Sequence, residues 1–144
     1  MKILVINGPN MNLLGLREPD IYGKQTYSDL VAVLQQKAEE LGVEISFMQS
    51  NHEGDLVDAI QGAWPDTDGI IINPAAYTHT SVAILDAVKA VGIPTVEVHM
   101  SDVKSRDEFR QVSYIRQACI ATFMGRGFGS YIDALELLVN RQKA

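Results

Sequence analysis

Three short apolar runs, each followed by a polar segment, constrain the fold of this chain more than any other feature. The runs cover residues 2–6, 69–72 and 94–98, and each ends in asparagine or histidine followed by further polar residues. Continuous apolar runs of this length are typical of strands buried on both faces of a parallel sheet. Segments with helical spacing separate them, and this alternation predicts a doubly wound α/β fold with right-handed crossovers.

Caps, breakers and periodicity predict the remaining elements. The first helix is expected from Ser28, a candidate N-cap, to Leu41, before Gly42. Its predicted buried stripe comprises Leu30, Val33, Leu34, Ala38 and Leu41. We further expect a strand over 43–49, a helix over 53–64, a helix that follows Thr80 and Ser81 and is stopped by Gly92, a short helix at 106–110, a strand over 118–124 and a closing helix over 131–141. Five strands favour one flavodoxin-like domain over residues 1–144, with the sheet order 2-1-3-4-5.

Length and composition are those of an ordinary globular protein. The chain has 144 residues, of which 47% are hydrophobic and 21% charged, enough for one domain with one core. No apolar run approaches the roughly 20 residues of a membrane helix. The first expected strand begins almost at Met1, so we expect no signal peptide, and the single cysteine, Cys119, favours a cytoplasmic setting.

Charge and ligand counts argue against nucleic-acid and metal binding. The net charge is -6, whereas nucleic-acid surfaces need clustered lysine and arginine. Three histidines, one cysteine and the absence of a His-Glu-x-x-His pair give little support for a metal centre. Glu53, Asp55 and Asp58 indicate either a cation site or, more simply, an acidic first turn of a helix.

Polar segments follow three of the expected strands, at residues 7–15, 73–81 and 99–102. The carboxyl ends of adjacent parallel strands meet at one edge of the sheet, where ligands bind in this class of fold. We therefore expect these segments to form a pocket for a polar small molecule. Residues 7–27 show no clear element, and connections this long are usually functional lids or disordered.

Glu97 and His99 lie two apart on an expected strand, so their side chains point to the same side. A carboxylate beside an imidazole selects its tautomer and stabilises the imidazolium, which suits a general acid; a structural polar pair is the alternative. Tyr22 is either a surface aromatic or, if Arg17 lies beside it, a general base. Lowering a phenol pKa from about 10 to near 7 takes roughly 4 kcal/mol, much of which an adjacent guanidinium supplies in a water-poor site.

Other residues keep two interpretations each. Arg110 is either a solvated charge or the bidentate partner of an anionic or polyhydroxyl substrate. Asp86 lies seven residues after His79 and either shares its face or forms a helical salt bridge. The glycine-rich segment 125–129 resembles a phosphate-binding turn but lacks the following Lys-Ser/Thr, so a tight strand-to-helix turn is favoured. Cys119 lies in an apolar run and is expected in the core.

The chain resembles the type II 3-dehydroquinate dehydratases over nearly its whole length. The motifs that carry the resemblance are Asn7-Gly-Pro-Asn-Met-Asn-Leu-Leu-Gly15, Arg17-Glu-Pro19, Tyr22-Gly23, Asn51-His-Glu-Gly54, Ile72-Asn-Pro-Ala-Ala-Tyr-Thr-His-Thr-Ser81, Glu97-Val-His-Met-Ser101, Arg106, Phe109-Arg110 and Ser113-Tyr114. The resemblance implies a flavodoxin-like fold and a lyase of the shikimate pathway, in aromatic amino-acid biosynthesis, that works without a cofactor.

The implied reaction is the anti elimination of water from 3-dehydroquinate, which gives 3-dehydroshikimate through an enolate. Carried onto this chain, the resemblance makes Tyr22 the base that takes the C2 proton, aided by Arg17. Asn10 helps to hold a water that stabilises the enolate. His99, paired with Glu97, protonates the departing hydroxyl.

The resemblance also implies substrate contacts and an assembly. The groups that would bind the substrate carboxylate and hydroxyls are Asn73, His79, the backbone amides of Met100 and Ser101, and Arg110. Asp86 would reach the site of a neighbouring subunit in a trimer, and four trimers commonly form a homododecamer. No nucleic acid or membrane partner is implied.

Four positions depart from the family pattern: Met11, where leucine is usual; Asp102, where asparagine is usual; and Arg116 and Ile120, at positions that are often small. Asp102 places a negative charge beside the expected carboxylate-binding amides. The rival interpretation from another class is a flavodoxin-like module that holds a flavin at the same edge, but the loops contain no clear phosphate cradle. A phosphate-ester hydrolase would need metal ligands that the sequence does not supply.

Overall fold

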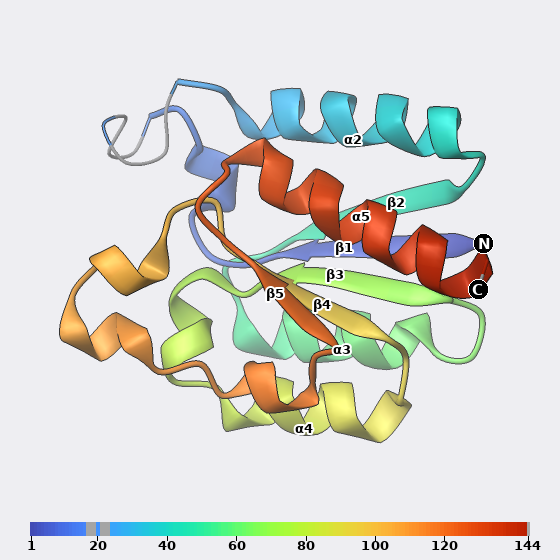
Figure 1. Ribbon diagram of the computed structural model, residues 1–144. Helices are drawn as coiled ribbons and strands as arrows, with labels where there is room; N and C mark the ends of the chain where they lie inside the picture. The colour runs from blue at the N-terminus through green and yellow to red at the C-terminus, as the bar shows by residue number, and fades with distance from the viewer. Residues whose placement is uncertain (17–19, 21–23, 144) are drawn as a thin grey trace.

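A five-stranded parallel sheet forms the centre of the computed structural model, which describes residues 1–16, 20 and 24–143 (Figure 1). The strands are β1 (Lys2–Asn7), β2 (Glu44–Gln49), β3 (Gly69–Asn73), β4 (Thr95–Val98) and β5 (Ala121–Phe123). Their order is β2-β1-β3-β4-β5, and all four pairings are parallel. The structure thus confirms the expected flavodoxin-like topology 2-1-3-4-5.

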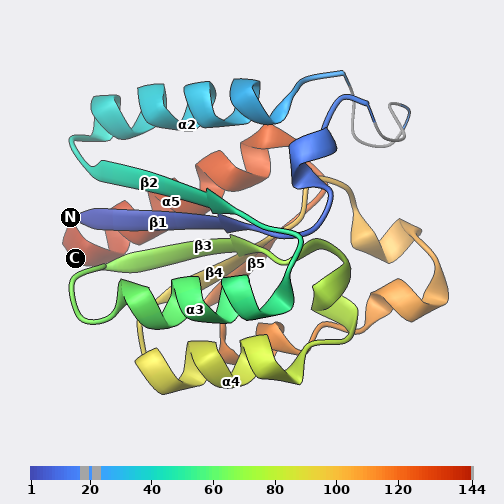
Figure 2. The same cartoon turned by 180° about the vertical axis from the view of Figure 1, so that it is seen from behind.

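Two helices cover each face of the sheet, as the two opposite views show (Figures 1 and 2). Helices α2 (Tyr27–Leu41) and α5 (Phe128–Lys143) lie on one face, and α3 (Glu53–Ala63) and α4 (Val82–Val91) lie on the other. Every residue of β3 is buried, which explains its unbroken apolar sequence. Within the described ranges, no helix has the length and apolar character needed to cross a bilayer.

The connections contain short 3₁₀ helices, which are η1 (Met11–Leu13), η2 (Ala75–His79), η3 (Val103–Ser105), η4 (Glu108–Gln111) and η5 (Ile115–Ala118). The sequence pattern indicated one of them, the short helix expected at 106–110, which overlaps η4, and did not separate the others from loops. The expected strand over 118–124 is therefore shorter, because η5 and the turn after it occupy its first residues. The closing helix begins earlier than expected, at Phe128.

The N-cap of α2 is Thr26, and the prediction of Ser28 was wrong. Thr26 Oγ1 accepts a hydrogen bond from the Asp29 backbone N–H at 3.2 Å, and Asp29 Oδ2 accepts one from the Thr26 N–H at 2.9 Å. This reciprocal pair is a capping box, and its acidic third residue distinguishes Thr26 from Ser28 as a start signal. The predicted stop is confirmed, because Gly42 takes the left-handed conformation after Leu41.

The loops after β1 and β3 are packed against each other. The Gly8 N–H donates to the carbonyl of Asn73 at 2.8 Å. A Cβ atom at position 8 would collide with the carbonyl of Pro74, so only glycine permits this approach. The polar residues that follow these two strands are thereby held side by side.

A buried polar network lies beneath these loops. Tyr131, on α5, donates its hydroxyl to Asn7 Oδ1 at 2.5 Å and accepts a bond from Asn73 Nδ2 at 3.0 Å. Tyr131 and Asn7 are fully buried. Burial raises the pKa of the Tyr131 phenol, so it remains a neutral donor. The ends of β1 and β3 are thus tied to α5 by a satisfied hydrogen-bond chain.

The capping box yields a stability prediction. Thr26→Ala removes the acceptor for the Asp29 N–H and should lower the free energy of unfolding by about 1 kcal/mol. Ser28→Ala is the matched control, because Ser28 lies exposed inside the first turn and should change stability by much less. Urea unfolding at fixed protein concentration measures both. Equal losses for the two variants would contradict the assignment of Thr26.

Candidate active site

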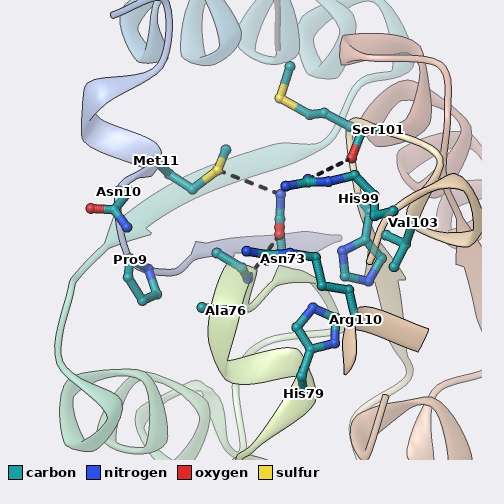
Figure 3. Close-up of a pocket in the computed structure, with 13 residues that line it drawn as sticks. Pro9, Asn10, Met11, Asn73, Ala76, His79, His99, Ser101, Val103 and Arg110 are labelled. Atoms are coloured by element: carbon teal, nitrogen blue, oxygen red, sulfur yellow. Dashed lines mark hydrogen bonds between the residues drawn. The ribbon is translucent and has the colours of Figure 1, made fainter. Parts of the chain in front are cut away.

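A polar pocket lies at the edge of the sheet where β1, β3 and β4 end (Figure 3). It is an open pocket, with about 640 Å³ of space around its lining atoms that includes open solvent. The thirteen residues that line it are Pro9, Asn10, Met11, Asn73, Ala75, Ala76, His79, His99, Met100, Ser101, Val103, Arg106 and Arg110. The three polar segments predicted to converge therefore do so.

The two sides of the pocket differ in chemistry (Figure 3). Pro9, Asn10 and Met11 lie on one side, and the side chains of His79, His99 and Arg110 lie on the other. Arg106 also lines the pocket, so two guanidinium groups and two imidazole rings border it. Guanidinium groups suit an anionic ligand, and imidazole nitrogens can pair with its hydroxyls.

Arg110 is only weakly neutralised within the described part of the chain. Its Nε is buried and has no hydrogen-bond partner there. The Asp107 carboxylate lies 3.9 Å away and is largely exposed, so it screens the charge little. The guanidinium also lies 4.9 Å from the centre of the Phe109 ring. Of the two interpretations of Arg110, the pocket geometry favours the anion partner over the solvated charge.

Glu97 is fully buried in β4 and saturated with hydrogen bonds. Its Oε2 lies 2.5 Å from His99 Nε2 and also accepts from Ser113 Oγ at 3.0 Å and Arg116 Nη2 at 3.0 Å. Its Oε1 accepts from Arg116 Nε at 3.1 Å and Thr122 Oγ1 at 3.3 Å. All these groups donate hydrogen bonds to Glu97, so its surroundings favour the ionised carboxylate over the protonated acid.

Burial alone would raise the pKa of Glu97, but the hydrogen bonds from His99 and Arg116 outweigh it and lower the pKa to about 2. An anionic Glu97 can only accept, so His99 carries a proton on Nε2. Its Nδ1 makes no hydrogen bond to any residue in the described ranges. This nitrogen is the one free for chemistry in the pocket.

His79 has the opposite tautomer, with its proton on Nδ1. Its Nδ1 lies 2.6 Å from the carbonyl oxygen of Val112, and a carbonyl can only accept, so Nδ1 carries the proton. Burial lowers the pKa of His79, which keeps the ring neutral at pH 7. Nε2 of His79 is then an acceptor for a ligand hydroxyl.

The structure brings together most of the site residues predicted from sequence. Asn10, Asn73, His79, Met100, Ser101, His99 and Arg110 line the pocket, and Glu97 supports it through His99. Asp86 does not line the pocket of its own chain; it lies exposed on α4. Arg17 and Tyr22 lie outside the described residues.

Arg106 is a pocket residue that the sequence pattern did not single out, although it stands in the matched motifs. Its Nη1 donates to Ser101 Oγ at 3.4 Å. The available signal was its spacing from Arg110, four residues away on an expected helical turn. Arg116, noted only as a departure, proves to be the bidentate partner of Glu97.

Three other sequence features have structural explanations. The Asp102 carboxylate accepts from the Lys104 N–H at 3.0 Å as the N-cap of η3, and it does not line the pocket. Positive φ angles at Gly125 and Gly127 support the tight-turn interpretation. Glu53 and Asp55 lie in the first turn of α3, and no group of three or more potential metal ligands occurs in residues 1–16, 20 and 24–143.

A carboxylate–imidazole pair that opens onto a polar pocket at this sheet edge is characteristic of a small-molecule enzyme with acid–base chemistry. The chain matches the family model described as dehydroquinase class II over residues 1–139. It is 55% identical to the 3-dehydroquinate dehydratase of Caldicellulosiruptor bescii, with 95% of each chain covered. The chain therefore belongs to the class II dehydroquinase family.

Solved structures of type II dehydroquinases also match the fold of this chain. The type II dehydroquinase from Butyrivibrio crossotus superposes with a TM-score of 0.94 at 48% identity, covering 96% of this chain and 97% of that one. The type II dehydroquinase from Propionibacterium acnes gives 0.93 at 40% identity, with 96% of each chain covered. Likeness at this level extends to the whole fold, including the sheet edge that bears the pocket.

The two pocket histidines should show opposite neutral tautomers. His99 should carry its proton on Nε2, because Glu97 accepts there, and His79 on Nδ1, because Val112 accepts there. Long-range ¹H–¹⁵N correlation spectra at alkaline pH distinguish the two forms, with His52→Gln used to remove the third histidine signal. The same tautomer for both rings would contradict the assigned geometry.

Proposed function

We propose that this protein dehydrates 3-dehydroquinate to 3-dehydroshikimate by anti elimination through an enolate, as a step of the shikimate pathway. Family membership supports the reaction and the substrate. The single observation that carries the mechanism is His99, held by the buried Glu97 carboxylate at the wall of a pocket that also contains the weakly neutralised Arg110. We place this step in cytoplasmic aromatic amino-acid biosynthesis.

The reaction begins with proton removal from C2 of the substrate. Tyr22, as phenolate, takes the proton, and the C–H electron pair moves toward the neighbouring carbonyl to give an enolate. Arg17 favours the phenolate by its positive charge. Asn10, at the pocket wall, helps to hold the water that donates to the enolate oxygen.

The second step expels the hydroxyl group from the carbon next to C2. The enolate pair returns to form the carbon–carbon double bond as the carbon–oxygen bond breaks. His99 supplies the proton that turns the leaving hydroxyl into water, and the anionic Glu97 stabilises the imidazolium that precedes transfer. Proton donor and base then return to their starting states by a net transfer from Tyr22 to His99 through solvent.

The substrate carboxylate and hydroxyls occupy the donor-rich side of the pocket. Backbone amides of Met100 and Ser101 and the Arg110 guanidinium bind anionic and hydroxyl oxygens. His79 accepts a hydroxyl hydrogen at Nε2, as its tautomer requires. Asn73 Oδ1 accepts the Ala75 N–H at 3.1 Å and its Nδ2 donates to Tyr131, so the amide that we place at the ligand is held in one orientation.

We further propose that the chain assembles as trimers, four of which form a homododecamer. In this arrangement Asp86 completes the site of a neighbouring subunit, which agrees with its exposure on α4 outside its own pocket. The exposed apolar side chains of the chain include Val82 on α4, Phe109 on η4 and Val112 directly after it. Sedimentation equilibrium that gives the mass of a monomer would contradict the assembly.

The function is tested by incubating the purified chain with 3-dehydroquinate. The conjugated enone of the product absorbs in the near ultraviolet, so turnover appears as rising absorbance, before and after treatment with a chelator. Substrate with one deuterium at C2, placed stereospecifically either anti or syn to the leaving hydroxyl, tests the stereochemistry. Loss of the deuterium that lies anti to the leaving hydroxyl supports the proposal, and loss of the syn deuterium contradicts it.

Tyr22→Phe should lower kcat by about 100-fold or more while substrate binding is nearly unchanged, because only the proton acceptor is lost. Tyr114→Phe is the control, since Tyr114 is partly exposed and does not line the pocket. Steady-state kinetics on both variants give the comparison. A Tyr22→Phe rate within about tenfold of wild type would exclude Tyr22 as the base.

The enolate route needs no covalent link to lysine. The thirteen pocket residues include no lysine, and the six lysines of the chain are Lys2, Lys24, Lys37, Lys89, Lys104 and Lys143. Borohydride added with substrate should therefore leave both activity and protein mass unchanged, because no imine is available for reduction. A substrate adduct on any lysine in the mass spectrum would overturn the mechanism.

A further inference from the structure

Arg116 forms the outer end of a contact chain that runs from the protein surface through Glu97 to His99. Its Nε donates to Glu97 Oε1 at 3.1 Å and its Nη2 to Oε2 at 3.0 Å, so both carboxylate oxygens are engaged by one planar group. The Arg116 side chain is 40% exposed, whereas that of Glu97 is 0% exposed. Arg116 does not line the pocket, so any effect on chemistry passes through Glu97.

The two-point contact restricts how the carboxylate can turn. A guanidinium fork fixes the plane of the carboxylate as well as its charge, which a lysine ammonium does not do. His99 Nε2 lies 2.5 Å from the same Oε2 that Arg116 engages. Rotation of the carboxylate would therefore move the acceptor away from the imidazole.

The other groups around Glu97 supply hydrogen bonds without charge. Thr122 faces it from β5, where it is the register partner of Glu97, and Ser113 faces it from the segment before η5. Burial, together with the Glu97 charge, raises the pKa of the Cys119 thiol to about 12, so this neighbour stays neutral. Besides His99, Arg116 is thus the cationic group that contacts Glu97 within the described residues.

We propose that Arg116 is a positioning residue for His99. Its guanidinium holds Glu97 anionic and in one orientation, so that the N–H at Nε2 of His99 donates to Glu97 and Nδ1 faces the pocket. The inference rests on the proposed role of His99 as the acid. It assigns to a half-exposed surface arginine a part in the chemistry of a pocket that it does not touch.

Removing the guanidinium should leave a pH signature. Arg116 is one of the groups that keep the pKa of Glu97 near 2, so Arg116→Ala should raise that pKa toward the range in which kinetics are measured. A protonated Glu97 no longer supports the imidazolium. The ratio of wild-type to variant kcat should therefore grow as the pH falls from 8 to 5.

The test is the pH profile of kcat and KM for Arg116→Ala. We expect kcat to fall by about tenfold near pH 7, more at lower pH, with KM changed less than twofold because Arg116 does not contact the ligand. Arg141→Ala removes an exposed arginine from the last turn of α5 and is the charge-matched control. Thermal unfolding curves establish that the variants fold.

Chemical rescue and a double-mutant cycle separate positioning from packing. Because Arg116 is partly exposed, millimolar guanidinium should restore part of the kcat of Arg116→Ala, whereas sodium chloride at equal ionic strength should not. In a Glu97→Gln background, Arg116→Ala should lower kcat little further, because the carboxylate that Arg116 holds is already absent. If Arg116→Ala does not fold, Arg116→Lys is tested instead. Lysine keeps the positive charge but cannot bind both carboxylate oxygens in one plane, so kcat should be intermediate and KM unchanged.

Three outcomes would overturn the inference: a wild-type kcat profile for Arg116→Ala, an equal loss at every pH without guanidinium rescue, or a full additional loss in the Glu97→Gln background. His99→Ala, assayed in parallel, distinguishes this failure from failure of the proposed function. A nearly inactive His99→Ala with a normal Arg116→Ala defeats only the role of Arg116. An active His99→Ala defeats the acid role itself, and with it the positioning role.

Discussion

The pairing of β1 with β3 at the centre of the sheet is the constraint on which the rest of the structure depends. The two strands run parallel and are covered by helices on both faces, which accounts for the apolar residues in their middle. The register aligns Asn7 with Asn73, which brings the two polar loops to the same level. The hydrogen bond from Gly8 to Asn73 then joins these loops, and the pocket forms beside them.

The site combines this backbone frame with a buried charge. A carboxylate inside a sheet is costly unless it is paired and hydrogen-bonded. Glu97 meets that condition because β4 supplies His99, β5 supplies Thr122, and the segment before β5 supplies Ser113 and Arg116. The negative charge of Glu97 is therefore stabilised inside the sheet, and it acts on the pocket through its hydrogen bond with His99.

Sequence alone was sufficient for the elements that repeat a strong pattern. Unbroken apolar runs predicted the central strands and their order, and the spacing of Glu97 and His99 predicted the pair that the structure confirms. Sequence was weaker where a choice depends on side-chain geometry. Ser28 and Thr26 are both suitable cap residues by type, and the acid at Asp29 favours Thr26 only when a capping box is considered. Nothing local in the sequence indicates that Arg116 turns inward to Glu97.

The buried hydroxyl of Tyr131 has a consequence for how the protein is made. Asn7 and Tyr131 are separated by 124 positions in the chain, yet their side chains share one hydrogen bond beneath the pocket. During synthesis β1 leaves the ribosome before α5, so the hydrogen bond between Tyr131 and Asn7 forms only after α5 has also emerged. In a ribosome-bound fragment that lacks α5, Asn7 and Asn73 lack the Tyr131 hydroxyl as a hydrogen-bond partner.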